Sequence, residues 1–527
     1  MAQTATTSSV SLTDSRIWRD DLRRNPPEVR VTSWIVLAGW GIYAAAMLWL
    51  AVTLNIWTDE AYTLRTTSST ISHALGSAIG FEQNAPLYFI LMWAWRRVSA
   101  SVIWARLFSL SCAAAAIVVV AKTLHRSFPR LDTRLLLLTL GLAPELVWSA
   151  LTIRLYALSI LLVALFTYIV GVTIAQDSRP TARQTLALAA VATVGIYTAY
   201  SFGILFAGFG CALVVLRRWR ALVAYAVAML VASLAFLPLL ALVRRTVAAY
   251  TQTYDFHPSL ATELTQYAWF AASNLAGLHR LATLVEKAPH RDVVGIALLA
   301  ALCCALALLR KRITAMTVAC ALATAVSLLL LAIVSVVEGV EFFANYLAFL
   351  LVPSFVAVAG VLDAAQPATR SLALTICCAV ALALDAGAFV GRYHNDANPG
   401  DWRRVASYLQ GRERAGEPVL VFTSEEALPL RFYYAGPNRL IPIPSQPSDT
   451  VYDSHDFVLR NGSQIDAALE KAGESPTSSL WLVREDQCSY GGVAFGCDAL
   501  ERWISARYDV VARAAFYESS VLELRRR

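Results

Sequence analysis

The sequence predicts an α-helical polytopic membrane protein with a C-terminal α/β domain. Of its 527 residues, 57% are hydrophobic and only 15% are charged, whereas soluble domains carry about 25% charged residues. The charges are also unevenly placed: residues 31–391 contain 37, residues 1–30 contain 9 and residues 392–527 contain 35. We therefore expect an N-terminal segment (1–30), a transmembrane domain (31–391) and a polar C-terminal domain (392–527), and we exclude a single soluble domain.

Eleven apolar runs are long enough to cross about 30 Å of hydrocarbon as helices. They are residues 31–54, 101–122, 134–152, 155–175, 184–200, 203–216, 221–243, 293–309, 313–337, 343–363 and 371–391. The division between 184–200 and 203–216 is needed because their combined length is too great for one crossing. A further run, Pro86 to Val98, is short and contains Arg96-Arg97, which favours a helix along the membrane interface.

Short basic clusters indicate the orientation of the spans. They lie at residues 122–134, 179–183, 217–220, 310–312 and 370, all on the same side of the membrane as the basic N-terminus. The positive-inside tendency places that side in the cytoplasm, so an odd number of spans puts residues 392–527 outside the cytoplasmic (inner) membrane. The net charge of +7 is explained by these clusters, and we expect membrane lipids rather than nucleic acid as partners.

The C-terminal domain shows alternating helix and strand patterns. We expect helices over 401–414 and 465–471, and strands over 418–422 and 480–483, which favours a partly parallel sheet. Of nine cysteines, only Cys488 and Cys497 lie in the polar tail. An extracytoplasmic location predicts a disulfide between them, and a cytoplasmic one predicts two free thiols.

The candidate chemistry lies at the outer rim of the spans. Asp59 and Glu60 are adjacent carboxylates just after the first span, and such groups are costly at a membrane boundary unless they are solvated, paired or used. An exposed acid pair is the alternative interpretation. Further polar residues follow near the outer ends of later segments, namely Glu82, Arg106 and Arg154.

The order of these motifs resembles the GT-C type of lipid-linked glycosyltransferases, particularly the branch of protein O-mannosyltransferases and aminoarabinose transferases (glycosyltransferase family 39). The motifs are Asp59-Glu60-Ala61-Tyr62, Ala85-Pro86-Leu87-Tyr88, Arg106-Leu107 and Arg154-Leu155-Tyr156. The resemblance is best over residues 35–220. It implies a GT-C-like fold, a polyprenyl-phosphate-linked sugar as donor, and an extracytoplasmic glycan, lipid or protein as acceptor.

The sequence departs from the pattern of the family at three places. Thr152 and Ser159 occupy positions near Arg154-Leu155-Tyr156 where the family commonly has a second acid. Asn84-Ala85 stands where the family has His or Lys before a Pro pair, and Asn345 replaces the Arg of a late Arg-Tyr-Leu motif. The substrate contacts at these positions are therefore expected to differ from those of the family.

Sugar transfer from a lipid phosphate needs a base for the acceptor hydroxyl and cations for the leaving phosphate. We expect Asp59 as general base and Glu60 as a metal ligand or an orienting partner. Because a guanidinium is a multidentate donor, the expected ligands of the donor phosphate are Arg106, Arg154 and Arg244. The further candidates for substrate binding are Tyr62, Glu82, Asn84, Tyr88, Glu145, Tyr156, His257, Glu341, Asn345 and Tyr346. Direct displacement predicts inversion at the sugar.

The sequence leaves the need for a metal cofactor open. Asp59, Glu60 and His257 are possible ligands of a divalent ion, but Asp255-Phe256-His257 is more simply a loop acid beside a packed histidine. A transporter or lipid flippase is the chief alternative function. It would favour polar groups near the bilayer midplane, whereas the polar groups here gather at one rim. A membrane-anchored binding protein would need only one span.

Overall fold

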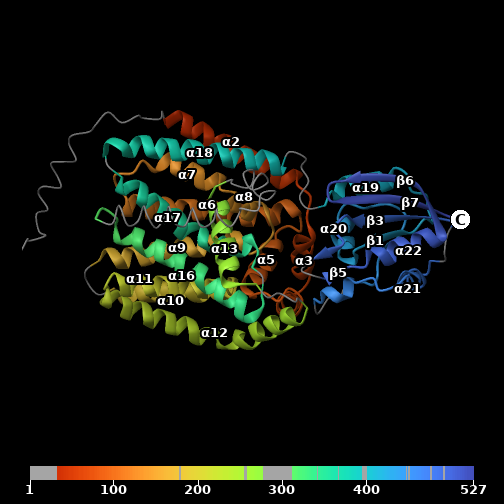
Figure 1. The fold of residues 1–527 in the computed structure, drawn as a ribbon, viewed down its shortest axis with the longest axis horizontal. Coiled ribbons are helices and arrows are strands. Elements are labelled where there is room, and N and C mark those ends of the chain that lie inside the picture. The colour runs from red at the N-terminus through yellow and green to blue at the C-terminus, as the bar shows by residue number, and fades with distance from the viewer. Residues whose placement is uncertain are drawn as a thin grey trace, which may run out of the picture.

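The computed structural model has a helical bundle and, at one end of it, a small α/β domain (Figure 1). The structure describes residues 33–176, 180–253, 258–276, 311–340, 342–365, 367–393, 400–446, 448, 452–474, 478–490 and 493–527.

Seven helical segments of the described chain are long and apolar enough to cross a membrane. They are α2 (Ser33–Thr53), α6 (Val102–Ser127), α9 (Tyr156–Ala175), α12 (Trp219–Thr253), α16 (Ala315–Glu338), η2 (Ala344–Leu350) with α17 (Leu351–Ala364), and α18 (Pro367–Tyr393). Helices α10 (Ala182–Thr198) and α11 (Phe202–Val215) are shorter, with 17 and 14 residues.

A bent pair of helices makes an eighth span if it is counted as one. Helices α7 (Thr133–Leu142) and α8 (Pro144–Leu151) meet at 56°. Between them Ala143 has a ψ of 128°, outside the helical region, because a residue before proline is driven away from it. The expected single span over 134–152 is therefore broken at Pro144.

The predicted fold class is confirmed: the chain is a multi-span helical membrane protein with a small C-terminal sheet domain. Within the described residues, every predicted span coincides with a helix or with the bent pair. The expected span over 293–309 lies outside the described residues, so the total of eleven stays a prediction.

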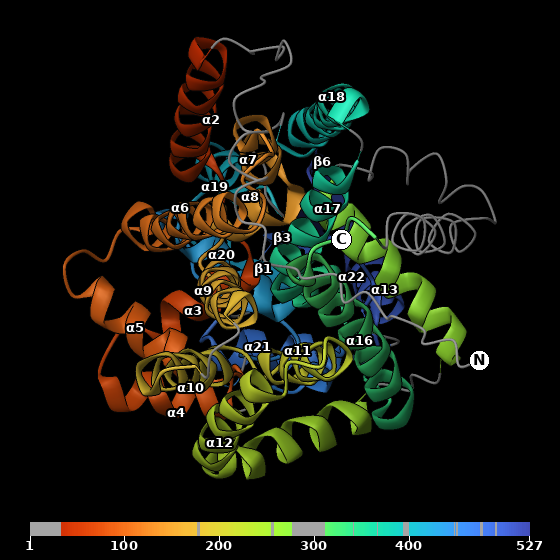
Figure 2. The same ribbon diagram turned by 90° about the vertical axis from the view of Figure 1, so that its left-hand side faces the viewer.

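Close packing joins α11 to α16, which are neighbours in the view along the bundle (Figure 2). A Cβ added at Gly208 of α11 would meet the Cα and carbonyl oxygen of Ala323 in α16 at 2.7 Å. Lipid tails are as apolar as leucine, so membrane helices associate through such small-residue contacts.

The described part of the bundle includes four further, shorter helices: α3 (Thr58–Thr66), α4 (Ile71–Gly80), α5 (Leu87–Arg96) and α13 (Leu260–Leu275). Helices α3 and α5 lie at the end of the bundle nearest the α/β domain (Figure 1), and α5 is the helix expected between Pro86 and Val98. Helix α3 carries acids in its first turn and Arg65 in its last, an arrangement that complements the helix dipole.

The α/β domain is built on a five-stranded sheet in the order β2-β1-β3-β7-β6. The strands are β1 (Val419–Phe422), β2 (Leu440–Pro442), β3 (Ser479–Glu485), β6 (Tyr508–Phe516) and β7 (Ser519–Arg526). Strands β2, β1 and β3 are parallel, whereas β7 pairs antiparallel with β3 and β6. The partly parallel sheet was expected, and the closing β6–β7 hairpin was not.

Helices cover both faces of this sheet. Val419 and Val421 of β1 pack with α19 (Trp402–Gln410) and α20 (Ala427–Arg431). Leu420 and Phe422 pack with α21 (Ser463–Lys471) and α22 (Cys497–Arg507) on the opposite face. Burial on two faces explains why β1 reads as a continuous apolar run.

Small elements connect the larger ones in this domain. They are η3 (Ser424–Glu426), η4 (Ser454–Phe457), β4 (Ser489–Tyr490) and β5 (Val493–Ala494). A disulfide joins Cys488 to Cys497 and so ties the β4–β5 hairpin to the start of α22.

Candidate active site

A fully buried ion pair anchors the start of α3. Glu60 and Arg106 are both 0% exposed, and Arg106 Nη2 lies 3.0 Å from Glu60 Oε2. Glu60 Oε1 also accepts a hydrogen bond from the backbone N–H of Ile153 at 2.9 Å. Arg106 Nε donates to the same carboxylate, and the remaining N–H groups donate to the carbonyl oxygens of Ala51, Leu54 and Asn55. All five N–H groups of Arg106 are thus engaged within the protein.

A second group of charges surrounds Arg154, just before α9. Its Nη1 donates to Glu82 Oε2 at 2.7 Å and to Thr63 Oγ1 at 3.1 Å, and its Nη2 lies 3.6 Å from Asp59 Oδ2. Burial raises the pKa of the Glu82 carboxyl, against the opposing attraction of Arg154. The side chain of Asp59 is 34% exposed, compared with 2% for Glu82. Asp59 is therefore the more accessible of the two carboxylates.

Several predicted substrate residues lie around the two charged groups. Asn345 Nδ2 donates to Tyr156 Oη at 2.9 Å, and the neighbouring Tyr346 is 43% exposed. Asn84 Nδ2 donates to the carbonyl oxygen of Glu82 at 2.7 Å. Tyr88 is fully buried, and its hydroxyl has no hydrogen-bond partner within the described part of the chain.

The α/β domain closes over the first turn of α3. Tyr62 Oη donates to Glu425 Oε2 at 2.7 Å, and Thr58 Oγ1 donates to Glu426 Oε1 at 2.9 Å. The backbone N–H of Ile56 donates to Tyr433 Oη at 2.8 Å. Figure 1 shows α20 beside α3 at this contact. Asp59 thus has acidic neighbours from two distant parts of the chain: Glu82 from the bundle, and Glu425 and Glu426 from the α/β domain.

The fold has counterparts among solved structures, although the sequence matches no family model and no curated protein. ArnT from Cupriavidus metallidurans in the apo state superposes with a TM-score of 0.56 at 13% identity, over 92% of this chain and 98% of that one. The same protein bound to undecaprenyl phosphate gives a TM-score of 0.56 at 12% identity, over 94% of this chain and 98% of that one. The chain has the fold of ArnT, the GT-C fold.

A further solved structure is less similar to this chain. The Archaeoglobus fulgidus oligosaccharyltransferase gives a TM-score of 0.44 at 13% identity, over 84% of this chain and 68% of that one. The ArnT match covers the α/β domain as well as the bundle, because nearly the whole of both chains is aligned.

Other predicted site residues belong to neither of the two charged groups or lie outside the described residues. Glu145 is 4% exposed in the first turn of α8 and accepts a hydrogen bond from Ser149 Oγ at 2.9 Å. Arg244 is exposed on α12. His257 and Glu341 lie outside the described residues, so their predicted roles stay predictions.

Whether the predicted metal site can form depends on His257 as well. Within the described ranges, no group of three or more His, Cys, Asp or Glu side chains is placed to hold a metal ion. The expected set of Asp59, Glu60 and His257 includes a residue that the structure does not describe. Glu60 is in contact with Arg106 and a backbone N–H, and its predicted role as a metal ligand or an orienting partner stays a prediction.

Some residues near the site were not indicated by the sequence. The guanidinium carbon of Arg392, at the end of α18, lies 4.3 Å from the centre of the Trp148 ring. Trp148 in turn packs on Trp57, and the centres of their rings are 5.4 Å apart. Glu425 and Glu426 also went unrecognised. Their one sequence signal is the position of two adjacent acids directly after a buried strand.

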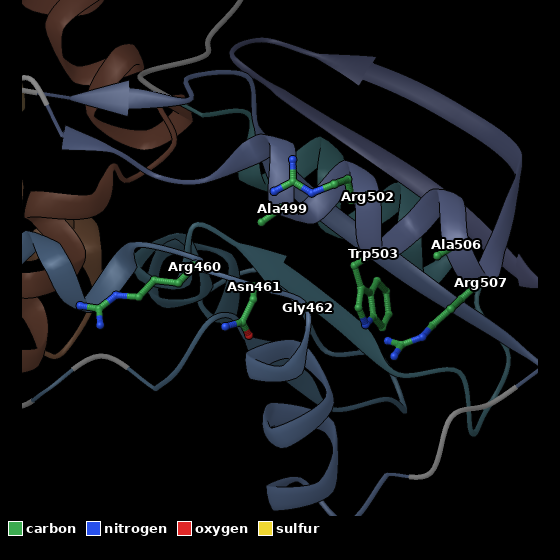
Figure 3. A pocket seen from close by; sticks show the side chains of 8 residues that line it. All are labelled: Arg460, Asn461, Gly462, Ala499, Arg502, Trp503, Ala506 and Arg507. Atoms are coloured by element: carbon green, nitrogen blue, oxygen red, sulfur yellow. The ribbon is translucent and has the colours of Figure 1, made fainter.

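A separate cavity of about 230 Å³ lies in the α/β domain between α22 and the start of α21 (Figure 3). Figure 3 shows Trp503 and Arg507 on one side of it and Asn461 on the other. Trp503 Nε1 and Arg507 both donate to Asp466. None of the residues lining the cavity belongs to the groups around Glu60 and Arg154, so we do not include it in the candidate active site.

Proposed function

We propose that this chain is an integral-membrane glycosyltransferase that transfers a sugar from a polyprenyl-phosphate donor to an extracytoplasmic acceptor. The GT-C fold supports this function, and the ArnT structure described as bound to undecaprenyl phosphate supports the donor class. The observation that carries the proposal is the partly exposed carboxylate of Asp59 beside the guanidinium of Arg154, 3.6 Å away. This pair lies where the bundle meets the α/β domain.

In the proposed reaction Asp59 accepts the proton of an acceptor hydroxyl as that oxygen attacks the anomeric carbon. The new carbon–oxygen bond forms while the bond from the sugar to the phosphate oxygen breaks, and polyprenyl phosphate leaves. Because one carboxylate acts as base without a covalent intermediate, the sugar inverts its configuration. Comparing the anomeric configuration of donor and product tests this step.

Arg154 is the proposed ligand of the leaving phosphate. Its Nε is buried without a hydrogen-bond partner among the described residues, so this guanidinium keeps donor capacity, and Glu82 fixes its orientation. A guanidinium stabilises the charge that develops on the phosphate. Arg106 was expected to share this role, but its five N–H groups are engaged by the protein, and we assign it to positioning α3 with Glu60.

The remaining predicted contacts complete the proposal. Arg244 stays a second candidate for the phosphate. Substrate contacts are proposed for Tyr62, Asn84, Tyr88, Glu145, Tyr156, His257, Glu341, Asn345 and Tyr346. We place the protein in the cytoplasmic membrane with its N-terminus inside and its α/β domain outside. A fusion reporter at the C-terminus tests this placement, and a cytoplasmic signal would overturn it.

The test of function uses the full chain in lipid nanodiscs with synthetic undecaprenyl-phosphate-linked hexoses and pentoses, and a cell-envelope extract as the source of acceptors. We expect transfer by the wild type and a loss of about 10²- to 10⁴-fold in Asp59→Asn, with donor binding retained. Glu470→Gln, at an exposed glutamate of α21, is the matched control. Full activity of Asp59→Asn would remove it as base, and a wild type that binds none of the donors would overturn the donor class.

A further inference from the structure

The parallel strands of the α/β domain end at an edge that faces α3. Thr423 to Glu426 follow β1 directly, and Glu485 ends the neighbouring parallel strand β3. In open α/β sheets, ligands bind in the crevice at the carboxyl ends of the strands. Here the same edge meets the first turn of α3 through the bonds of Glu425 and Glu426 to Tyr62 and Thr58.

Three buried polar atoms at this edge have no hydrogen-bond partner among the described residues. They are Thr423 Oγ1, Ser424 Oγ and Glu426 Oε2, on residues that are 0%, 0% and 5% exposed. Buried polar groups in folded proteins are nearly always hydrogen-bonded. Three unpaired atoms within four consecutive residues therefore point to a ligand that supplies the missing partners.

The titratable groups around the edge are predominantly carboxyl groups, and burial raises the pKa of Glu425, Glu426 and Glu485. Glu425, Glu426 and Glu485 form no ion pair within the described residues, and Asp59 faces them from α3. Asp486 and Glu518 lie beside Glu485. Three cations on neighbouring segments are engaged by other groups: Arg154 contacts Asp59 and Glu82, the guanidinium carbon of Arg65 lies 5.4 Å from the centre of the Tyr62 ring, and Arg484 pairs with Glu501. Such a surface accepts hydrogen bonds from hydroxyl groups, and above about pH 7, where Glu425 and Glu485 are deprotonated, it repels anions.

We propose that this acidic edge, defined by Thr423, Ser424, Glu425, Glu426 and Glu485, binds the acceptor, and that the acceptor is a hydroxyl-rich glycan without negative charge on the bound sugar. The inference rests on the proposed function, because the edge faces the base Asp59. In the present structure the hydroxyl of Thr58 donates a hydrogen bond to Glu426, and that of Tyr62 donates one to Glu425. An entering sugar hydroxyl has the same donor chemistry and replaces them.

Binding of a matched pair of small sugars tests the inference without requiring turnover. The full chain in nanodiscs is titrated at about pH 8 with methyl β-glucoside and methyl β-glucuronide, which differ only in carrying a hydroxymethyl or a carboxylate group, and binding is followed by saturation-transfer NMR. We expect the glucoside to bind at least about tenfold more tightly. In the Glu425→Gln/Glu426→Gln variant this preference falls to about twofold or less, while Glu470→Gln keeps the wild-type ratio.

A second variant separates recognition from a folding defect. Thr423→Val preserves the side-chain shape and removes one unpaired hydroxyl, and we expect it to weaken glucoside binding about tenfold without affecting binding of the undecaprenyl-phosphate donor. Equal binding of the two sugars, tighter binding of the glucuronide, or binding of neither by the wild type would each overturn the inference. A persistent preference together with full activity of Asp59→Asn would instead overturn the proposed base and leave the acidic edge intact.

Discussion

Two adjacent carboxylates at the start of α3 occupy opposite environments. Glu60 is fully buried against Arg106, whereas the side chain of Asp59 is 34% exposed beside Arg154. Successive residues on a helix point in different directions, so one acid of the pair faces the interior and the other faces the site. A general base must reach the proton it accepts, and this requirement favours Asp59 over Glu60.

This difference predicts distinct effects of two conservative substitutions. Glu60→Gln leaves the buried charge of Arg106 without its counter-ion, and we expect it to lower the free energy of unfolding by about 3–5 kcal/mol. Asp59→Asn removes a partly exposed charge and is expected to cost less than about 1 kcal/mol. Unfolding of the detergent-solubilised protein by denaturant measures both values. Similar losses for the two variants would contradict the assignment of Glu60 to structure.

The sequence alone predicts the acid pair but not the division of roles. Arg106 and Arg154 both stand near the outer ends of spans, and hydropathy gives no reason to treat them differently. The different roles of the two arginines depend on tertiary contacts. Arg106 donates to backbone carbonyls at the end of α2, whereas Arg154 donates to Glu82, which lies in a loop 72 residues earlier in the chain. A phosphate role for Arg106 was therefore a reasonable expectation that its contacts do not support.

At the level of elements, local hydropathy patterns in the sequence predict the positions of most helices and strands. Helix α9 occupies Tyr156–Ala175 where a span over 155–175 was expected, and β1 occupies Val419–Phe422 where a strand over 418–422 was expected. Apolar length cannot reveal the break between α7 and α8, because hydropathy does not register the backbone constraint at Pro144. Strand β6 was missed because most of its side chains are exposed or half-buried, so it lacks a buried apolar face.

The contact of α11 with α16 yields a prediction at this scale. Gly208→Ala forces a methyl group to within 2.7 Å of the backbone of Ala323, and backbone atoms cannot move aside as a flexible side chain does. We expect a loss of about 1–3 kcal/mol in unfolding free energy, measured as above. Gly203→Ala on the same helix is the control, since no atom lies within 4 Å of its added Cβ. Equal behaviour of the two variants would show that the helices do not pack this closely.

Over the whole molecule, the site depends on two regions that are far apart in sequence. The bonds from Tyr62 to Glu425 and from Thr58 to Glu426 join residues 363 and 368 positions apart. The sequence predicts a polar domain on the same side of the membrane as Asp59, but no local pattern specifies which of its surfaces meets α3. The placement of an acidic edge over the proposed base therefore emerges only from the assembled fold.

This contact predicts a pH dependence of the docking of the α/β domain. Burial raises the pKa of Glu425 to about 7, with a further contribution from Asp59, and burial together with Glu425, Glu518 and Asp486 raises that of Glu485 to about 7. A carboxyl group whose pKa is higher in the folded state stabilises that state below its unfolded pKa, and this stabilisation is lost as the pH rises through the folded value. Docking should therefore weaken between about pH 4.5 and pH 7, because the deprotonated acids repel one another and Asp59.

Hydrogen exchange of the backbone amides in residues 58–66 and 423–426 measures this docking in the full chain. We expect stronger protection at about pH 5 than at about pH 8, after correction for the intrinsic pH dependence of exchange. Glu425→Gln carries a neutral side chain at every pH, so its protection should vary less across this range, whereas Glu470→Gln should behave as the wild type. Protection that is constant or rises with pH in the wild type would show that these carboxyl groups do not control the contact.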